Sequence, residues 1–260
     1  MLRPRIIPCL LVHNGGLVKT VHFSAPKYVG DPLNAVRIFN EKEVDELIVV
    51  DIDATVQMRE PNYTLIANLA AECRMPLCYA GGIKTPGQVE HVISLGVEKV
   101  AISSAAIQSL DLVAESARRV GNQSIVVVLD VKKTGLLRRY ELVTHNGTRA
   151  TGLDPIEFAR RAEAMGAGEI LVNSIDRDGE MQGYDHALVE KVRDAVNVPL
   201  SALGGAGSLA DIENLIRHHG IIGAAAGSLF VFKGKYRAVL IQYPMRADKD
   251  ALCIRAMGPA

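Results

Sequence analysis

The sequence has neither an excess of charge of one sign nor a long apolar run. Lys plus Arg and Asp plus Glu both number 29, so the formal net charge at pH 7 is zero. This balance does not favour a nucleic-acid partner or a basic membrane-binding surface. No run of about 18 apolar residues is present, so no membrane-spanning helix is expected. The short apolar segment after Arg3 and Arg5 lacks a small-residue cleavage site, and we expect a first strand there rather than a signal peptide.

Spacings typical of metal ligands are also missing. The four cysteines, Cys9, Cys73, Cys78 and Cys253, form no CxxC motif, and the seven histidines show no spacing that suits a metal site. We therefore expect no metal and no cofactor. Because no secretory signal is expected, the thiols are expected to stay reduced in the cytoplasm, where disulfides are rare.

What the sequence does contain is an internal repeat. Residues 46–53 read ELIVVDID and residues 169–176 read EILVNSID, 123 residues later. Gly81-Gly82 and Gly204-Gly205 follow at the same offset, and Ser104 and Ser228 are 124 residues apart. A chain of 260 residues that repeats at about half its length indicates a duplicated half-domain.

Eight short runs rich in Val and Ile alternate with longer amphipathic stretches. The runs are apolar throughout rather than alternating, which is typical of parallel strands covered on both faces. We predict strands at 5–12, 46–52, 76–80, 98–103, 124–131, 168–174, 198–203 and 222–227. Helical periodicity covers 35–44, 110–120 and 155–166, and Asp31-Pro32 and Asp154-Pro155 are residue pairs that begin helices.

This alternation predicts an α/β fold, a single (β/α)8 TIM barrel built from two repeated half-barrels. The barrel is expected over residues 1–244, and residues 245–260 are expected to be a loosely held C-terminal tail. In this fold, functional residues lie at the carboxyl ends of the strands and in the loops that follow. The candidate site residues are therefore those at the predicted strand ends.

The two glycine pairs are the first candidates. Glycine lets backbone N–H groups approach a phosphate closely. Each pair has small or hydroxyl-bearing partners at the end of the next strand. These sets are Gly81, Gly82, Ser103 and Ser104 in the first half, and Gly204, Gly205, Gly227 and Ser228 in the second. A lone Gly-Gly pair is more often a structural turn, but two symmetry-related pairs predict two phosphate sites across the barrel mouth.

Asp130 ends the fifth predicted strand and is a candidate general acid or base. The alternative is a plain ion pair with Lys132 or Lys19. The repeat aligns IPCLLV at 7–12 with VVVLDV at 126–131, so Leu11 stands where its counterpart in the second half is Asp130. The two halves therefore differ at the position best placed for proton transfer.

Further polar candidates follow other strands. Asp51 ends the second predicted strand, and Asp176, Asp178 and Gly179 belong to SIDRDG at 174–179. For SIDRDG the alternative is simple loop capping. Lys19 lies in the long segment between positions 13 and 32, a candidate lid that brings this lysine to a substrate. The alternative there is a solvated lysine.

Four charged residues lie at the opposite ends of the strands. Arg5, Glu46, Lys99 and Glu169 each stand near a strand start, and Glu46 and Glu169 are repeat partners. Their alternating signs predict a charged ring at the barrel floor. Floor residues ordinarily serve stability, so a closing salt-bridge cluster is the simpler interpretation.

Together these residues resemble the cyclase subunit of imidazole glycerol phosphate synthase, from about position 5 to about position 232. The motifs are RIIPCL, GDP at 30–32, DELIVVDI, GGIKT, GVEKV, GAGEIL, NSIDRDG, GYD at 183–185 and GGAG. The resemblance implies an ammonia-dependent synthase or lyase with a substrate phosphorylated at both ends. It also implies a glutaminase partner on the N-terminal face, whose ammonia passes a gate formed by Arg5, Glu46, Lys99 and Glu169.

Two departures from the family pattern bear on the chemistry. Two aspartates act as acid and base in that family; one matches Asp130, and the other belongs at position 11, where CLLV replaces CLDV. Asp53 stands where the histidine-pathway pattern DITAS has threonine. It is an alternative source of a carboxylate, though not the one we favour.

CLLV, LVKT, PKYVGDP and GSLFVF are most similar to a divergent subgroup of surface-polysaccharide pathways. That resemblance implies ammonia delivery for amidination of a nucleotide sugar, with a third amidotransferase protein as a further partner. One alternative is a working cyclase of histidine biosynthesis that makes imidazole glycerol phosphate and aminoimidazole carboxamide ribonucleotide. Another is a non-catalytic ammonia conduit or scaffold.

Overall fold

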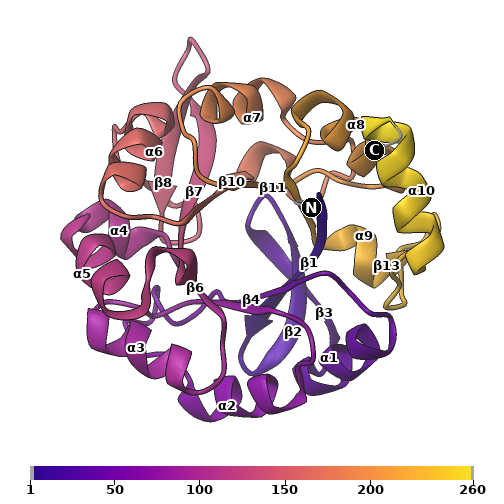
Figure 1. Cartoon of the computed structure of the whole chain (residues 1–260), viewed down its shortest axis with the longest axis horizontal. Helices are drawn as coiled ribbons and strands as arrows, with labels where there is room; N and C mark the ends of the chain where they lie inside the picture. The colour runs from indigo at the N-terminus through magenta and orange to yellow at the C-terminus, as the bar shows by residue number, and fades with distance from the viewer. Residues whose placement is uncertain (1–2, 259–260) are drawn as a thin grey trace.

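The computed structural model describes residues 3–258, and its central element is a closed ring of eight parallel strands (Figure 1). These are β1 (Arg5–His13), β4 (Leu47–Asp51), β5 (Leu77–Ala80), β6 (Lys99–Ile102), β7 (Ile125–Thr134), β10 (Glu169–Ser174), β11 (Leu200–Leu203) and β12 (Gly223–Ala226). Each pairs with its neighbour in that order, β12 pairs with β1, and the β10–β7 pairing completes the ring. The predicted (β/α)8 TIM barrel and all eight predicted strands are confirmed.

Helices surround the ring. They are α1 (Pro32–Glu41), α2 (Tyr63–Glu72), α3 (Pro86–Ser94), α4 (Ser104–Gln108), α5 (Asp111–Val120), α6 (Pro155–Ala164), α7 (His186–Arg193), α8 (Leu209–His219), α9 (Ser228–Val231) and α10 (Arg246–Met257), with 3-10 turns at Asn122–Ser124 and Ile175–Arg177. Asp31 caps α1 by accepting from the Asn34 N–H, and Asp154 caps α6 in the same way. Both predicted helix starts are confirmed. None of the helices between residues 3 and 258 has the length and apolar character needed to cross a membrane.

Each half-barrel carries a β-hairpin after its first strand. In the first half β2 (Gly16–Val21) turns back along β1 and pairs with β3 (Ser24–Gly30). In the second half β7 extends into a hairpin with β8 (Arg139–Thr144), which pairs with β9 (Arg149–Ala150). The expectation of a long loop between positions 13 and 32 was therefore wrong, because its backbone groups are paired in a sheet. A smaller hairpin joins β13 (Phe232–Lys233) and β14 (Ala238–Val239).

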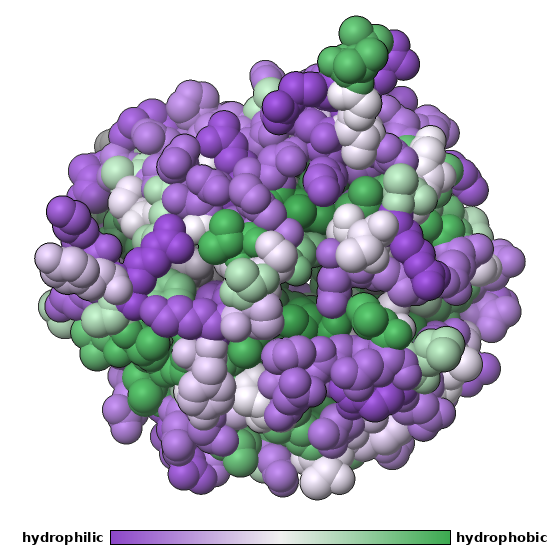
Figure 2. All heavy atoms as spheres, turned by 180° about the vertical axis from the view of Figure 1, so that it is seen from behind, coloured by the Kyte–Doolittle hydropathy of each residue, from purple (hydrophilic) through white to green (hydrophobic). Residues whose placement is uncertain are grey.

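The β7–β8 hairpin projects from the barrel. Leu136 and Leu137 end it with exposed fractions of 103% and 75%. Seen from behind Figure 1, this tip is the hydrophobic projection at the upper edge, and the centre of the same face is hollowed (Figure 2).

The core has two layers. The outer layer lies between the strands and the helices and contains most buried aliphatic side chains. The inner layer faces the barrel interior and is made of small or medium side chains: Ile7, Cys9, Ile48, Cys78, Ala101, Val126, Val128, Leu171 and Ala225. Burial on both faces explains why the strands are apolar throughout.

Most of the segment expected as a loosely held tail forms helix α10, and residues 259 and 260 lie outside the described residues. Helix α10 lies beside α8 (Figure 1), with Leu252 only 1% exposed and Arg255 paired with Glu213 of α8 at 2.9 Å. The sequence pattern gave no sign of this helix, because the segment is rich in charged residues and has only a narrow apolar stripe.

Candidate active site

One cavity runs along the barrel from its mouth to its floor. It encloses about 1540 Å³ of empty space, including the part open to solvent. At the mouth its lining includes both predicted glycine turns and their partners, Ser103, Ser104, Gly227 and Ser228. At the floor it reaches Glu46 and Glu169. The cavity therefore joins the two sets of candidates that the sequence separates.

The glycine turns have equivalent geometry in the two halves. Gly81 has φ +125° and Gly204 has φ +98°. A Cβ atom would lie 2.5 Å from the Asp51 backbone oxygen at Gly81, and 2.5 Å from the Ser174 backbone oxygen at Gly204. Asp51 and Ser174 are themselves 123 residues apart. Only glycine allows each turn to pack directly onto the end of the preceding strand.

The strand ends beside these turns also match. Ser103 precedes α4 with φ −111° and ψ −89°, and Gly227 precedes α9 with φ −104° and ψ −74°. The next residues, Ser104 and Ser228, both line the cavity. Neither side-chain hydroxyl has a hydrogen-bond partner among residues 3–258. Two equivalent polar turns therefore face the mouth with hydroxyl groups free to bind an anion.

A substitution tests how strictly these turns require glycine. Gly204→Ala should lower the free energy of unfolding through left-handed backbone strain of about 1–3 kcal/mol and through the clash with Ser174, which adds about 1–3 kcal/mol. The matched control is Gly152→Ala, because Gly152 has φ +72° but open space around a Cβ. Denaturant midpoints should fall further for Gly204→Ala. Equal losses would show that Gly204 is only a turn former.

Lys19 lies inside the mouth rather than in solvent. It is on β2 with 5% of its surface exposed, and its ammonium group donates to the Cys9 backbone oxygen. Burial lowers the pKa of Lys19, while nearby Cys9 and Asp178 work to raise it. Its ammonium group also lies directly against Gly227. The solvated alternative was therefore wrong, and the hairpin places this lysine beside Gly227, the partner of the second glycine turn.

Asp130 faces the cavity and is held by two neutral donors. It accepts from Ser103 Oγ at 2.8 Å and from Asn173 Nδ2 at 3.0 Å. Burial raises the pKa of Asp130, and the two hydrogen bonds oppose that shift. No ion pair with Lys132 or Lys19 is present among residues 3–258, so the ion-pair alternative was wrong. Sequence reasoning missed Asn173, although its two-residue spacing from Leu171 places it on the same inner face of β10.

Leu11 borders the cavity from the opposite side of the ring. It packs against the inner core together with Val50, Ala80 and Leu203. Its neighbours in this layer, as far as the described residues go, are apolar. Asp53 accepts from His13 Nδ1 and from the Asn14 N–H, each at 2.7 Å, and does not line the cavity. The alternative that Asp53 compensates for Leu11 is therefore not favoured by the geometry.

The remaining acidic candidates shape loops. Asp51 accepts from the backbone N–H groups of Asp53 and Ala54. Asp178 accepts from Thr20 Oγ1 at 2.8 Å and from the Phe23 N–H, which fixes the first hairpin to the second half of the barrel. Asp176 accepts from the Lys133 N–H at 2.8 Å. Asp51, Asp178 and Gly179 nevertheless border the cavity, whereas Asp176 does not.

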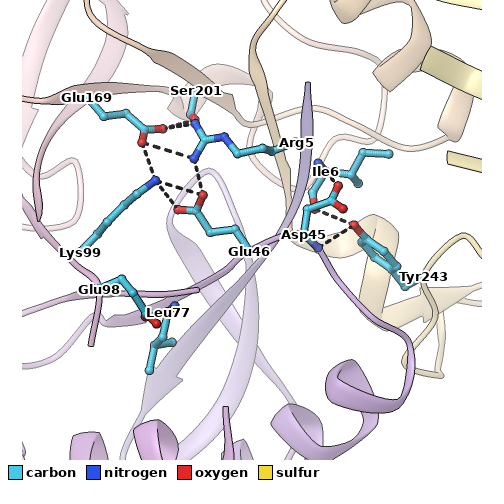
Figure 3. Close-up of polar contacts among 10 residues, drawn as sticks. All are labelled: Arg5, Ile6, Asp45, Glu46, Leu77, Glu98, Lys99, Glu169, Ser201 and Tyr243. Atoms are coloured by element: carbon cyan, nitrogen blue, oxygen red, sulfur yellow. Dashed lines mark hydrogen bonds and ion pairs between the residues drawn. The ribbon is translucent and has the colours of Figure 1, made fainter. Parts of the chain in front are cut away.

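The four floor residues form one charged ring (Figure 3). Arg5 pairs with Glu46 and, at 2.7 Å, with Glu169; Lys99 pairs with Glu46 at 3.0 Å and with Glu169 at 2.8 Å. Burial works to lower the pKa of Lys99, but the two carboxylates together raise it. Burial likewise works to raise the pKa of Glu169, and the two cations hold it below its usual value. The ring therefore stays charged and closed.

Ser201 is a fifth member of the ring that sequence reasoning missed. Its hydroxyl donates to Glu169 Oε1 and accepts from Arg5 Nη2 at 3.3 Å (Figure 3). Its repeat partner is Cys78, so the repeat gave no polar counterpart to reveal it. The ring closes the barrel floor at the end of the cavity.

Comparison with known proteins identifies the family. Residues 5–237 match the model of the family described as histidine biosynthesis protein. The chain belongs to the histidine biosynthesis protein family. Curated proteins are also similar to this chain over nearly its whole length.

Three relatives illustrate the similarity. A protein of Leptospira interrogans is 57% identical over 97% of this chain and 99% of its own length. A protein of Vibrio vulnificus (strain YJ016) is 55% identical over 96% of each chain, and one of Pseudomonas aeruginosa is 55% identical over 94% of this chain and 97% of its own. Their provisional names are imidazole glycerol phosphate synthase subunit HisF, hisF3 and hisF2, respectively.

Proposed function

We propose that this chain is a cyclase-type subunit that takes ammonia from a glutaminase docked on its N-terminal face. This proposal rests on one observation. The cavity joins the charged ring at the floor to the two glycine turns at the mouth. A small neutral molecule entering at the floor would travel between apolar walls and reach a ligand at the mouth. The names of the relatives, which call them subunits of an imidazole glycerol phosphate synthase, support the same interpretation.

The mouth fits a small substrate phosphorylated at both ends. The turns at Gly81-Gly82 and Gly204-Gly205 provide backbone N–H groups, and Ser104 and Ser228 provide hydroxyls. Lys19 adds an amino group beside Gly227, at the end of the next strand. Asp51, Asp178 and Gly179 border the same space and are proposed substrate contacts, with Asp176 behind them. A pure conduit would not need these groups, which disfavours the scaffold alternative.

The reaction itself is proposed to have diverged from histidine synthesis. Asp130 remains, half-buried and hydrogen-bonded, but Leu11 supplies no second proton-transfer group across the cavity. We propose that ammonia serves amidination of a nucleotide sugar in surface-polysaccharide biosynthesis in the cytoplasm, with a third amidotransferase protein.

Deleting the gene in its own organism separates the two pathways. A diverged subunit predicts growth without added histidine, together with loss of the amidino group from surface polysaccharide, measured by mass spectrometry of the released sugars. Deletion of the partner glutaminase gene should give the same sugar defect. A strain that requires histidine and keeps its polysaccharide unchanged would instead support the working cyclase.

A further inference from the structure

A second polar network lies beside the charged ring and ties the C-terminal segment to it. Asp45 Oδ2 accepts from the Ile6 N–H at 2.9 Å, and Asp45 Oδ1 accepts from Lys249 Nζ at 2.8 Å. The Tyr243 hydroxyl donates to the Ile6 backbone oxygen at 2.8 Å and accepts from the Asp45 N–H at 3.2 Å (Figure 3). Lys249 also donates to the Glu43 backbone oxygen at 3.0 Å. Lys249 is only 7% exposed, which is unusual for a lysine and indicates a fixed position.

This network lies below the point at which the backbone pairing of β1 with β4 begins. The backbone pairing of these strands begins at Cys9 and Ile48 and continues toward the mouth. Below that pair, Ile6 and Asp45 occupy the equivalent register, but side chains rather than backbone groups join them. The separation of the two strand starts therefore depends on Asp45, Tyr243 and Lys249.

The residues next in sequence are members of the ring. Arg5 precedes Ile6, Glu46 follows Asp45, and the two side chains pair directly with each other. A change in the spacing of the strand starts would move these two charges apart. Two of the four ring residues are thus held in place by a segment nearly 200 residues away in the chain.

We propose that Lys249 and Tyr243 are positioning residues that keep the charged ring closed. They act through Asp45 and Ile6 and do not touch the ammonia path themselves. This inference rests on the proposed passage of ammonia through the ring. It gives α10, which carries Lys249, a role in that passage, because the helix helps to hold the charged ring in its closed arrangement.

The test uses the complex with its glutaminase and glutamine labelled with ¹⁵N in the amide. The fraction of label that appears as free ammonium in bulk solution is measured while the acceptor system is present. Lys249→Met keeps the approximate length and burial of the side chain but removes the ammonium group that donates to Asp45 Oδ1. We expect the ratio of free to delivered label to rise about 2- to 10-fold, the range that the loss of one hydrogen bond to a closed state gives. Lys249→Arg should restore most of the difference.

The matched control is Arg255→Met on the same helix, which breaks the exposed pair with Glu213 but leaves Asp45 untouched. It should leave the ratio unchanged. Tyr243→Phe removes only the bridging hydroxyl and keeps the aromatic side chain packed on Phe230. This variant replaces Lys249→Met in the test if Lys249→Met does not fold. Unchanged leakage in both Lys249→Met and Tyr243→Phe, beside a wild type that delivers its nitrogen, would overturn the positioning role alone. If the wild-type complex itself releases all of its label, the proposed function fails, and the inference fails with it.

Discussion

Purified protein mixed with the ribulosyl substrate of histidine synthesis and ammonium salts is expected to form almost no imidazole glycerol phosphate. The cavity holds Asp130 on β7, whereas β1 on the opposite side of the ring presents Leu11. Positioned acid–base groups contribute about 10²–10⁴-fold each. We therefore expect turnover at least about 100-fold below that of a family member with both aspartates. The measurement is product formation with saturating ammonium, which bypasses any glutaminase.

Leu11→Asp should recover part of that loss, by about tenfold or more if the rest of the mouth is intact. The matched control is Val50→Asp, because Val50 pairs with Leu11 in register and also lines the cavity. It adds the same charge one strand away. A gain with Leu11→Asp alone would assign the missing function to that position. Wild-type turnover equal to an ordinary cyclase, or equal gains from both variants, would contradict the proposed divergence.

The same variant has a pH signature. Burial already raises the pKa of Asp130, and a second carboxylate across the cavity would raise the pKa of the pair further. A carboxyl group with a folded-state pKa above its unfolded value binds protons more tightly in the folded state, so stability falls as pH rises. Relative to wild type, Leu11→Asp should thus lose free energy of unfolding between about pH 4 and pH 7. Unfolding curves at these two pH values measure the difference.

The sequence predicted the features that depend on local pattern and on the repeat. Apolar runs fix strands, Asp-Pro pairs fix helix starts, and the symmetric offsets brought both glycine turns to one mouth. The four ring residues were also found, because charge at a strand start stands out against an apolar barrel.

Features that depend on tertiary contacts were missed. Ser201 and Asn173 are ordinary polar residues in strands, and only their partners across the barrel reveal what they do. Lys19 was expected in a lid because hairpin pairing between β2 and β3 has no strong turn signal in the sequence. The position of Lys249 could not be inferred either, because its partner Asp45 is 204 residues away.

Lys99→Met is expected to have the largest effect on the charged ring. It leaves Glu46 and Glu169 with Arg5 as their only cation in the ring, and breaking a buried ion pair from one side costs about 3–5 kcal/mol. Stability should fall, and ammonia from the glutaminase should reach bulk solution rather than the acceptor. Stability and nitrogen delivery would both be lost, so this variant alone does not distinguish a gate from a closing salt-bridge cluster.

The double variant Lys99→Met, Glu46→Gln makes that distinction. It removes one charge of each sign and leaves Arg5 paired with Glu169, so most of the lost stability should return. A gate predicts that ammonia continues to leak, because two of the four groups that close the floor are gone. If delivery recovers together with stability, the ring serves only the fold. The two readings thus predict opposite outcomes for nitrogen delivery at matched stability, and labelled glutamine with thermal unfolding of the same samples measures both.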